Sequence, residues 1–178
     1  RLVEDLQVGN RILTRENGMQ PIRWIGTQTL MRPQMRAHQH PIRVRAGALG
    51  RGLPERDIIV SQNHRLLIVD PSLSVLFGES ETLVAAKHLV GRPGIERLPV
   101  DRVTYIHVLF DHHEIVCSNG GWTESFQPGD HTMDSIGKDQ RNEIYLLFPD
   151  LRNRDHRAFP TARMILKRHE AALLGQIV

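Results

Sequence analysis

The chain has 178 residues, of which 40% are hydrophobic and 24% are charged, and its formal net charge is +3. This length suits one domain with a proper core, and the composition is that of an ordinary globular protein. No stretch approaches the roughly 20 apolar residues of a membrane helix, so we expect no membrane partner. The single cysteine, Cys117, excludes an intrachain disulfide and any zinc site built on several thiolates.

The first part of the chain is predicted to consist of short β-strands separated by turns. In chain order, the expected strands are 11–15, 21–30, 42–45, 57–61, 65–69, 103–110 and 114–118. Apolar and polar residues alternate in several of these, which is typical of strands with one buried face. Asn17-Gly18 and Asn119-Gly120 indicate hairpin turns, because both residue types tolerate positive φ. Asn119-Gly120 also has the chemistry for succinimide formation.

The last part of the chain has a different pattern. Apolar residues recur at roughly helical spacing over 134–148 and again over 161–174, with Pro149 ending the first helix and Thr161 capping the second. Residues 150–160 are polar and are predicted to form a linker. We therefore expect a β domain over 1–132 and a helical extension over 133–178, and we expect the β domain to fold without the extension.

Two short motifs carry side chains suited to proton transfer. Ser61-Gln62-Asn63-His64 sets a hydroxyl three residues before an imidazole, and the imidazole can give or take a proton near neutral pH. Asp111-His112-His113 follows an expected strand and suits catalysis or metal binding. Taken alone, either motif is equally an ordinary polar turn.

Two further features suggest ligands. His38-Gln39-His40 places two imidazoles on one face of an extended segment, which is a possible metal pair, but no third ligand is assigned beside them. Residues 32–56 hold six arginines against one glutamate and form either a solvated face or a polyanion-binding surface. This segment lacks interleaved aromatic residues, so we expect no nucleic-acid partner, and we expect neither a metal nor a cofactor.

Five stretches, in this order, resemble the Hint (hedgehog/intein-type) domain family, and in particular its bacterial branch. They are VEDLQVGNRILT (3–14), GMQPIRWIG (18–26), DIIVSQNHRLL (57–67), LVAAKHLV (83–90) and the pair VTYIHV and HEIVCSNG within 103–120. The resemblance implies an all-β fold, a flattened horseshoe of two pseudo-symmetric halves, followed here by the two-helix extension.

The resemblance also implies a self-directed reaction. In the family, a Cys or Ser at the first position attacks the preceding peptide carbonyl, and a second nucleophile resolves the resulting thioester or ester. On this pattern His64 is expected to protonate the leaving amide nitrogen, Ser61 to donate to the developing oxyanion, and His113 to act as base for the incoming nucleophile.

The sequence departs from the family pattern in several places. The nucleophile is expected directly before Arg1, so that the chain begins after it. Ile106 stands where many inteins have Asp, with His107 adjacent, and Thr123-Glu124-Ser125 stands where inteins end in His-Asn. Without that pair full splicing is not expected. Cys117 is expected to be a buried packing residue rather than a nucleophile.

The sequence thus predicts a self-processing domain of a larger bacterial protein, which acts on its own upstream segment by an N–S acyl shift. Water or a small nucleophile would complete the cleavage. Two alternatives stay open: a degenerate Hint module without chemistry, and a binding module that uses the arginine face for polyanions. The compartment is also open, with export as part of a larger protein one option.

Overall fold

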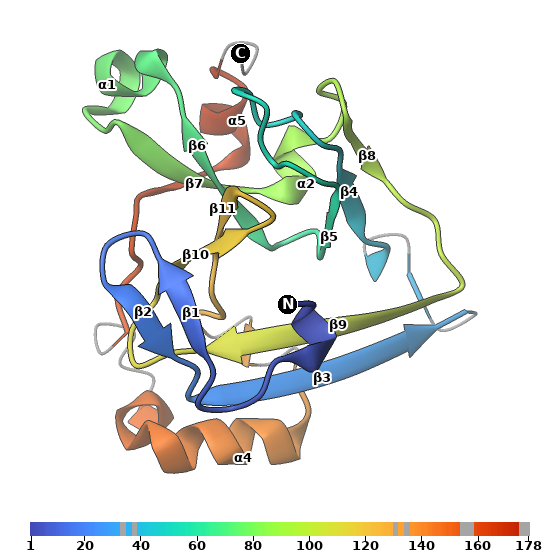
Figure 1. Ribbon diagram of the computed structural model, residues 1–178, viewed down its shortest axis with the longest axis vertical. Helices are drawn as coiled ribbons and strands as arrows, with labels where there is room; N and C mark the ends of the chain where they lie inside the picture. Colours follow the sequence, from blue (N-terminus) through green and yellow to red (C-terminus); the bar gives the residue numbers. More distant parts are fainter. Residues whose placement is uncertain (33–34, 37–38, 130–131, 134–135, 154–158, 175–178) are drawn as a thin grey trace.

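The computed structural model describes residues 1–32, 35–36, 39–129, 132–133, 136–153 and 159–174, and β-strands predominate in it (Figure 1). The strands are β1 (Arg11–Thr14), β2 (Gly18–Pro21), β3 (Trp24–Met31), β4 (Ile42–Val44), β5 (Ile58–Val60), β6 (Arg65–Val69), β7 (Glu81–Ala85), β8 (Ile95–Arg97), β9 (Arg102–Leu109), β10 (Ile115–Ser118), β11 (Gly121–Glu124) and β12 (Ile165–Leu166). The helices are η1 (Val3–Asp5), α1 (Pro71–Phe77), α2 (Ala86–Leu89), α4 (Lys138–Leu147), η3 (Pro149–Asn153) and α5 (Arg168–Ala171). The predicted all-β class is confirmed. Among the described residues, no helix has both the length and the apolar character to cross a bilayer.

Three sheets make up the β body. The largest has the order β12-β7-β6-β11-β10-β1-β2, while β3 pairs with β9 and β4 lies between β5 and β8. The β10–β11 hairpin turns at Asn119 and Gly120, whose φ angles of 48° and 78° are the positive values that an Asn-Gly turn requires. This hairpin pairs with β1 on one side and with β6 on the other, so one sheet combines strands from the start, the middle and the later part of the chain.

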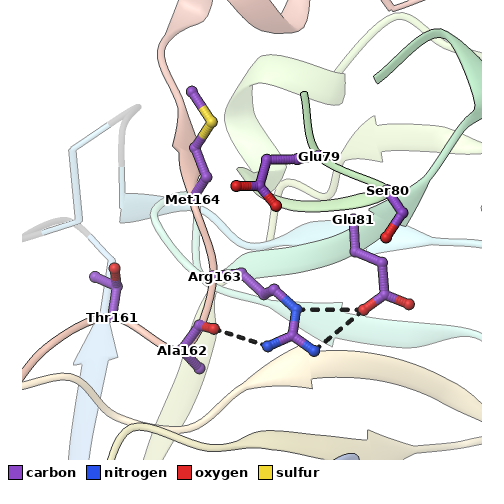
Figure 2. Close-up of a pocket in the computed structure, with 7 residues that line it drawn as sticks. All are labelled: Glu79, Ser80, Glu81, Thr161, Ala162, Arg163 and Met164. Atoms are coloured by element: carbon purple, nitrogen blue, oxygen red, sulfur yellow. Dashed lines mark hydrogen bonds and ion pairs between the residues drawn. The ribbon is translucent and has the colours of Figure 1, made fainter. Parts of the chain in front are cut away.

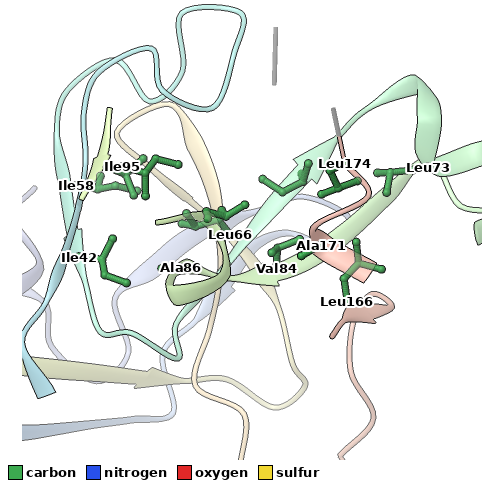
Figure 3. Packing of buried hydrophobic residues seen from close by; sticks show 13 residues of the cluster. Ile42, Ile58, Leu66, Leu73, Val84, Ala86, Ile95, Leu166, Ala171 and Leu174 are labelled. Atoms are coloured by element: carbon green, nitrogen blue, oxygen red, sulfur yellow. The ribbon is translucent and has the colours of Figure 1, made fainter. Parts of the chain in front are cut away.

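The two larger hydrophobic clusters hold these sheets and the C-terminal extension together. The first cluster combines Leu66 and Val84 of the seven-stranded sheet with Ile42 of the three-stranded sheet β5-β4-β8. Leu166 and Ala171 of the extension belong to the same cluster (Figure 3). The second cluster combines Trp24, Leu109 and Phe126 with residues of the extension, namely Met133, Ile136, Ile144, Leu151 and Phe159. The extension therefore contributes to both clusters. In Figure 1, α4 runs along the long β3–β9 ribbon, and Trp24 Nε1 donates to Glu143 Oε2 of that helix at 2.8 Å.

The predicted helix over 161–174 is wrong. Ile165 and Leu166 form β12, which pairs in parallel with Leu83 and Val84 of β7, and only α5 is helical. The physical reason is that β7 has an open edge beside a buried face, and two consecutive apolar residues bury more surface there than on a short isolated helix. The other predicted helix, 134–148, is represented by α4; residues 134–135 lie outside the described part of the chain.

Candidate functional site

The candidate site begins at the turn that follows β5. The His64 N–H donates to the Ser61 carbonyl at 3.2 Å, which closes the turn predicted from the sequence. The start of α2 holds this turn from the other side, because the N–H of Ala86 donates to the His64 carbonyl at 2.9 Å and that of Lys87 donates to the Gln62 carbonyl at 3.0 Å. The backbone of His64 is therefore fixed from two sides.

The imidazole of His64 has an unusual environment. Its Nε2 atom is buried and has no hydrogen-bond partner among the described residues, although part of the residue remains accessible to solvent. Burial lowers the pKa of His64, Arg65 and His113 act in the same direction, and only Glu124 opposes them. The ring is consequently neutral near pH 7, with a buried polar atom free to exchange a proton.

Glu124, at the end of β11, supplies the negative charge of the site. Its side chain is 9% exposed, and it accepts from the N–H of Arg65 at 2.8 Å and from the Arg65 guanidinium at 2.7 Å. Burial tends to raise the pKa of Glu124, but His113, His64 and Arg65 outweigh burial and leave the pKa below its ordinary value. The carboxylate is therefore ionised beside a neutral His64.

His113 has both ring nitrogens engaged. Its side chain is fully buried, its Nδ1 accepts from the Ala162 N–H at 2.9 Å, and its Nε2 lies 3.3 Å from Glu124 Oε2. The second contact has ion-pair distance but not the alignment of a strict hydrogen bond. Because Nδ1 must offer its lone pair to Ala162, the proton of a neutral ring resides on Nε2. The expected role of His113 as a general base is therefore not supported, since its lone pair is already used.

A third imidazole, that of His107 in β9, lies close enough to His64 for His64 to influence the pKa of His107. Burial lowers the pKa of His107 to about 4, and repulsion from His64 adds to the effect. The ring contacts Phe126 edge-on with centroids 5.1 Å apart, and Phe126 also packs against Trp24. Trp24 can lie there because Gly26 has no side chain: a Cβ at Gly26 would come within 2.1 Å of the indole.

The geometry therefore gathers five side chains from the β5–β6 turn, β6, β9, the β9–β10 loop and β11: His64, Arg65, His107, His113 and Glu124. The sequence profile of the Hint domain matches residues 1–130. The chain belongs to the Hint domain family. Hint domains as a class are self-processing domains, and this chain is one of them. None of the curated proteins compared with the chain matches it.

Two of the residues that complete this Hint site were not singled out by the sequence prediction. Glu124 was seen only as a departure from the intein His-Asn pair, and His107 only as the neighbour of Ile106. The available signal was strand alternation, which places His107 and Ile106 on opposite faces of β9. Ser61 directly follows β5, and its role as an oxyanion donor stays a prediction.

Two other predictions from the sequence concern ligands: the His38 and His40 metal pair and the arginine face. His38 lies outside the described residues, and His40 Nδ1 accepts from the Val100 N–H at 3.3 Å. Within the described ranges, no group of three potential metal-binding side chains is found. Of the arginine face, Arg43 and Arg45 share Glu96, which leaves less free positive charge for a polyanion than the sequence indicates.

Two further features of the molecule are Cys117 and a surface groove. Cys117 is free and only partly buried, so it is less buried than the packing residue that the sequence predicts, and its strand partner is Trp122. A groove of about 460 Å³ lies between residues 79–81 and 161–164 (Figure 2). None of the site's imidazoles lines it, although Ala162, whose N–H donates to His113 Nδ1, does.

Proposed function

We propose that this Hint domain cleaves the segment upstream of Arg1 by an N–S (or N–O) acyl shift, with His64 as the group that moves the proton. The observation that carries the proposal is the buried, unpartnered Nε2 of a neutral His64 within electrostatic reach of the ionised Glu124. A neutral imidazole can accept the proton of an attacking thiol or hydroxyl.

The lowered pKa of His64 then assists the next part of the reaction, in which the leaving amide nitrogen receives a proton. Once protonated, a buried imidazolium is a stronger acid than an ordinary one, and an amide nitrogen leaves only when it receives a proton. The nucleophile's sulfur or oxygen bonds to the upstream carbonyl carbon, the C–N bond breaks, and the proton passes through His64 to the nitrogen. Glu124 stabilises the transient positive charge on His64, and the Ser61 hydroxyl is the candidate donor to the oxyanion.

Water or a small nucleophile then attacks the thioester or ester carbonyl and releases the upstream segment. Splicing is not proposed, because Thr123-Glu124-Ser125 stands where inteins end in His-Asn. A degenerate domain is the less favoured alternative: a buried imidazole and carboxylate cost stability, and clusters of shifted ionisable groups concentrate at functional sites.

The test is a fusion that places a reporter protein and then Cys directly before Arg1, with a Cys→Ala fusion as the matched control. We expect the Cys fusion alone to release the reporter, faster with thiols or hydroxylamine that capture a thioester. His64→Ala should slow release by about 10²–10⁴-fold, and Ser61→Ala by about 10²–10³-fold. A folded Cys fusion that never releases the reporter would favour the degenerate alternative. Unchanged release in His64→Ala would remove His64 from the mechanism.

A further inference from the structure

One contact at the site comes from outside the stretch that matches the family. The Ala162 N–H that donates to His113 Nδ1 belongs to the C-terminal extension, whereas the family match ends at residue 130. His113 is itself a neighbour of Glu124, so the extension reaches the charged part of the site through one side chain.

The segment that carries this N–H is held firmly in place. The N–H of Leu83 in β7 donates to the Met164 carbonyl at 2.8 Å, immediately before β12 pairs with the same strand. The Arg163 guanidinium donates to the Ala162 carbonyl at 2.8 Å and contacts Glu81 at 3.3 Å (Figure 2). Ala162 also packs against the cluster formed by Leu67, Leu83 and Ile115. Its N–H is therefore presented at a fixed position.

A fixed donor at Nδ1 has a chemical consequence for His113. A protonated Nδ1 would face the Ala162 N–H with two hydrogens between the nitrogens, so this contact favours the ring with a bare Nδ1 and its proton on Nε2. That proton lies toward Glu124 and leaves the carboxylate negative. A doubly protonated His113 would instead bring a full positive charge to Glu124 and weaken its stabilisation of a charged His64.

We propose that residues 161–163 are a positioning element of the self-processing site, in which the Ala162 N–H fixes the tautomer of His113 and thereby keeps Glu124 available to His64. Ala162 and His113 are positioning residues, since neither meets the reacting atoms. The expected effect on cleavage rests on the proposed function. The tautomer of His113 does not depend on that function.

The experiment compares Ala162→Pro with Ala162→Gly in the full chain. Proline removes the N–H, whereas glycine keeps it and serves as the matched control. The ring ¹⁵N shifts of His113, assigned by their loss in His113→Gln, should show a bare Nδ1 in the wild type and in Ala162→Gly, but not in Ala162→Pro. In the Cys fusion, Ala162→Pro should release the reporter more slowly than Ala162→Gly, by up to about 10²-fold.

The possible failures can be told apart. A protonated Nδ1 in the wild type overturns the positioning inference, whether or not Ala162→Pro folds. Equal release by the two variants, with both showing cooperative unfolding, overturns it as well. A bare Nδ1 in a fusion that folds but never releases the reporter overturns the proposed function, and with it the catalytic half of the inference.

Discussion

Replacing His107 with glutamine should change how the stability of the domain depends on pH. In the folded protein the pKa of His107 is about 4, against an ordinary value of 6.5. Between these values the unfolded chain binds more protons than the folded one, so the free energy of unfolding falls as pH falls. Between pH 8 and pH 5, the titration of this one histidine lowers the free energy of unfolding by about 2 kcal/mol.

The assay is urea unfolding at pH 8 and pH 5, followed by tryptophan fluorescence. The wild type should lose about 2 kcal/mol more than His107→Gln between the two pH values, because the glutamine cannot titrate. His112→Gln is the matched control, since His112 is exposed in the β9–β10 loop and should leave the wild-type dependence intact. Equal losses in the wild type and His107→Gln would refute the argument that burial keeps this ring neutral.

Two other predictions concern the turn and the cysteine. Gly120→Ala should destabilise the domain by about 1 kcal/mol or more, because φ is +78° and the new Cβ would meet the Glu55 side chain at 2.9 Å. Gly137→Ala, at a position with open space, should lower the stability less. Equal midpoints of denaturant unfolding for the two variants would contradict this reasoning. Cys117→Ser should leave reporter release unchanged; loss of release there, together with release that survives in His64→Ala, would identify Cys117 as the nucleophile.

The sequence predicts the strands and turns that are determined by neighbouring residues in the chain. The strand over 65–69 was predicted with the bounds that β6 has, because an unbroken apolar run follows a polar turn. The Asn119-Gly120 hairpin followed from two residues that accept positive φ. By contrast, the helix α1 was not predicted, although Asp70 caps it, Pro71 begins it and Gly78 ends it with φ of 73°. Those end signals were present, but the seven-residue helix is too short to show a period.

The site was predictable only in part, for a physical reason. His64 and Ser61 lie in one turn, so their spacing is visible in the sequence. Glu124 can be buried because Arg65, on a strand 59 residues earlier, and His113 stabilise its charge. A carboxylate in a polar stretch looks like a surface residue until its partner is known. The role of Ala162 has no side-chain signal at all, because the contact uses its backbone.

The predicted independence of the β domain is the expectation that the packing most calls into question. A chain ending at residue 132 loses the extension's share of both clusters, which exposes Trp24 and leaves the edge of β7 unpaired. We expect this chain to show no cooperative unfolding. Leu166→Ala in the whole chain tests the same point: Leu166 is 1% exposed, so its loss should cost about 2–5 kcal/mol. Leu173→Ala, 58% exposed, should change stability by no more than about 0.5 kcal/mol. If the two variants unfold alike and the shortened chain unfolds cooperatively, the extension is an appendage, and its contact with His113 is dispensable for the fold.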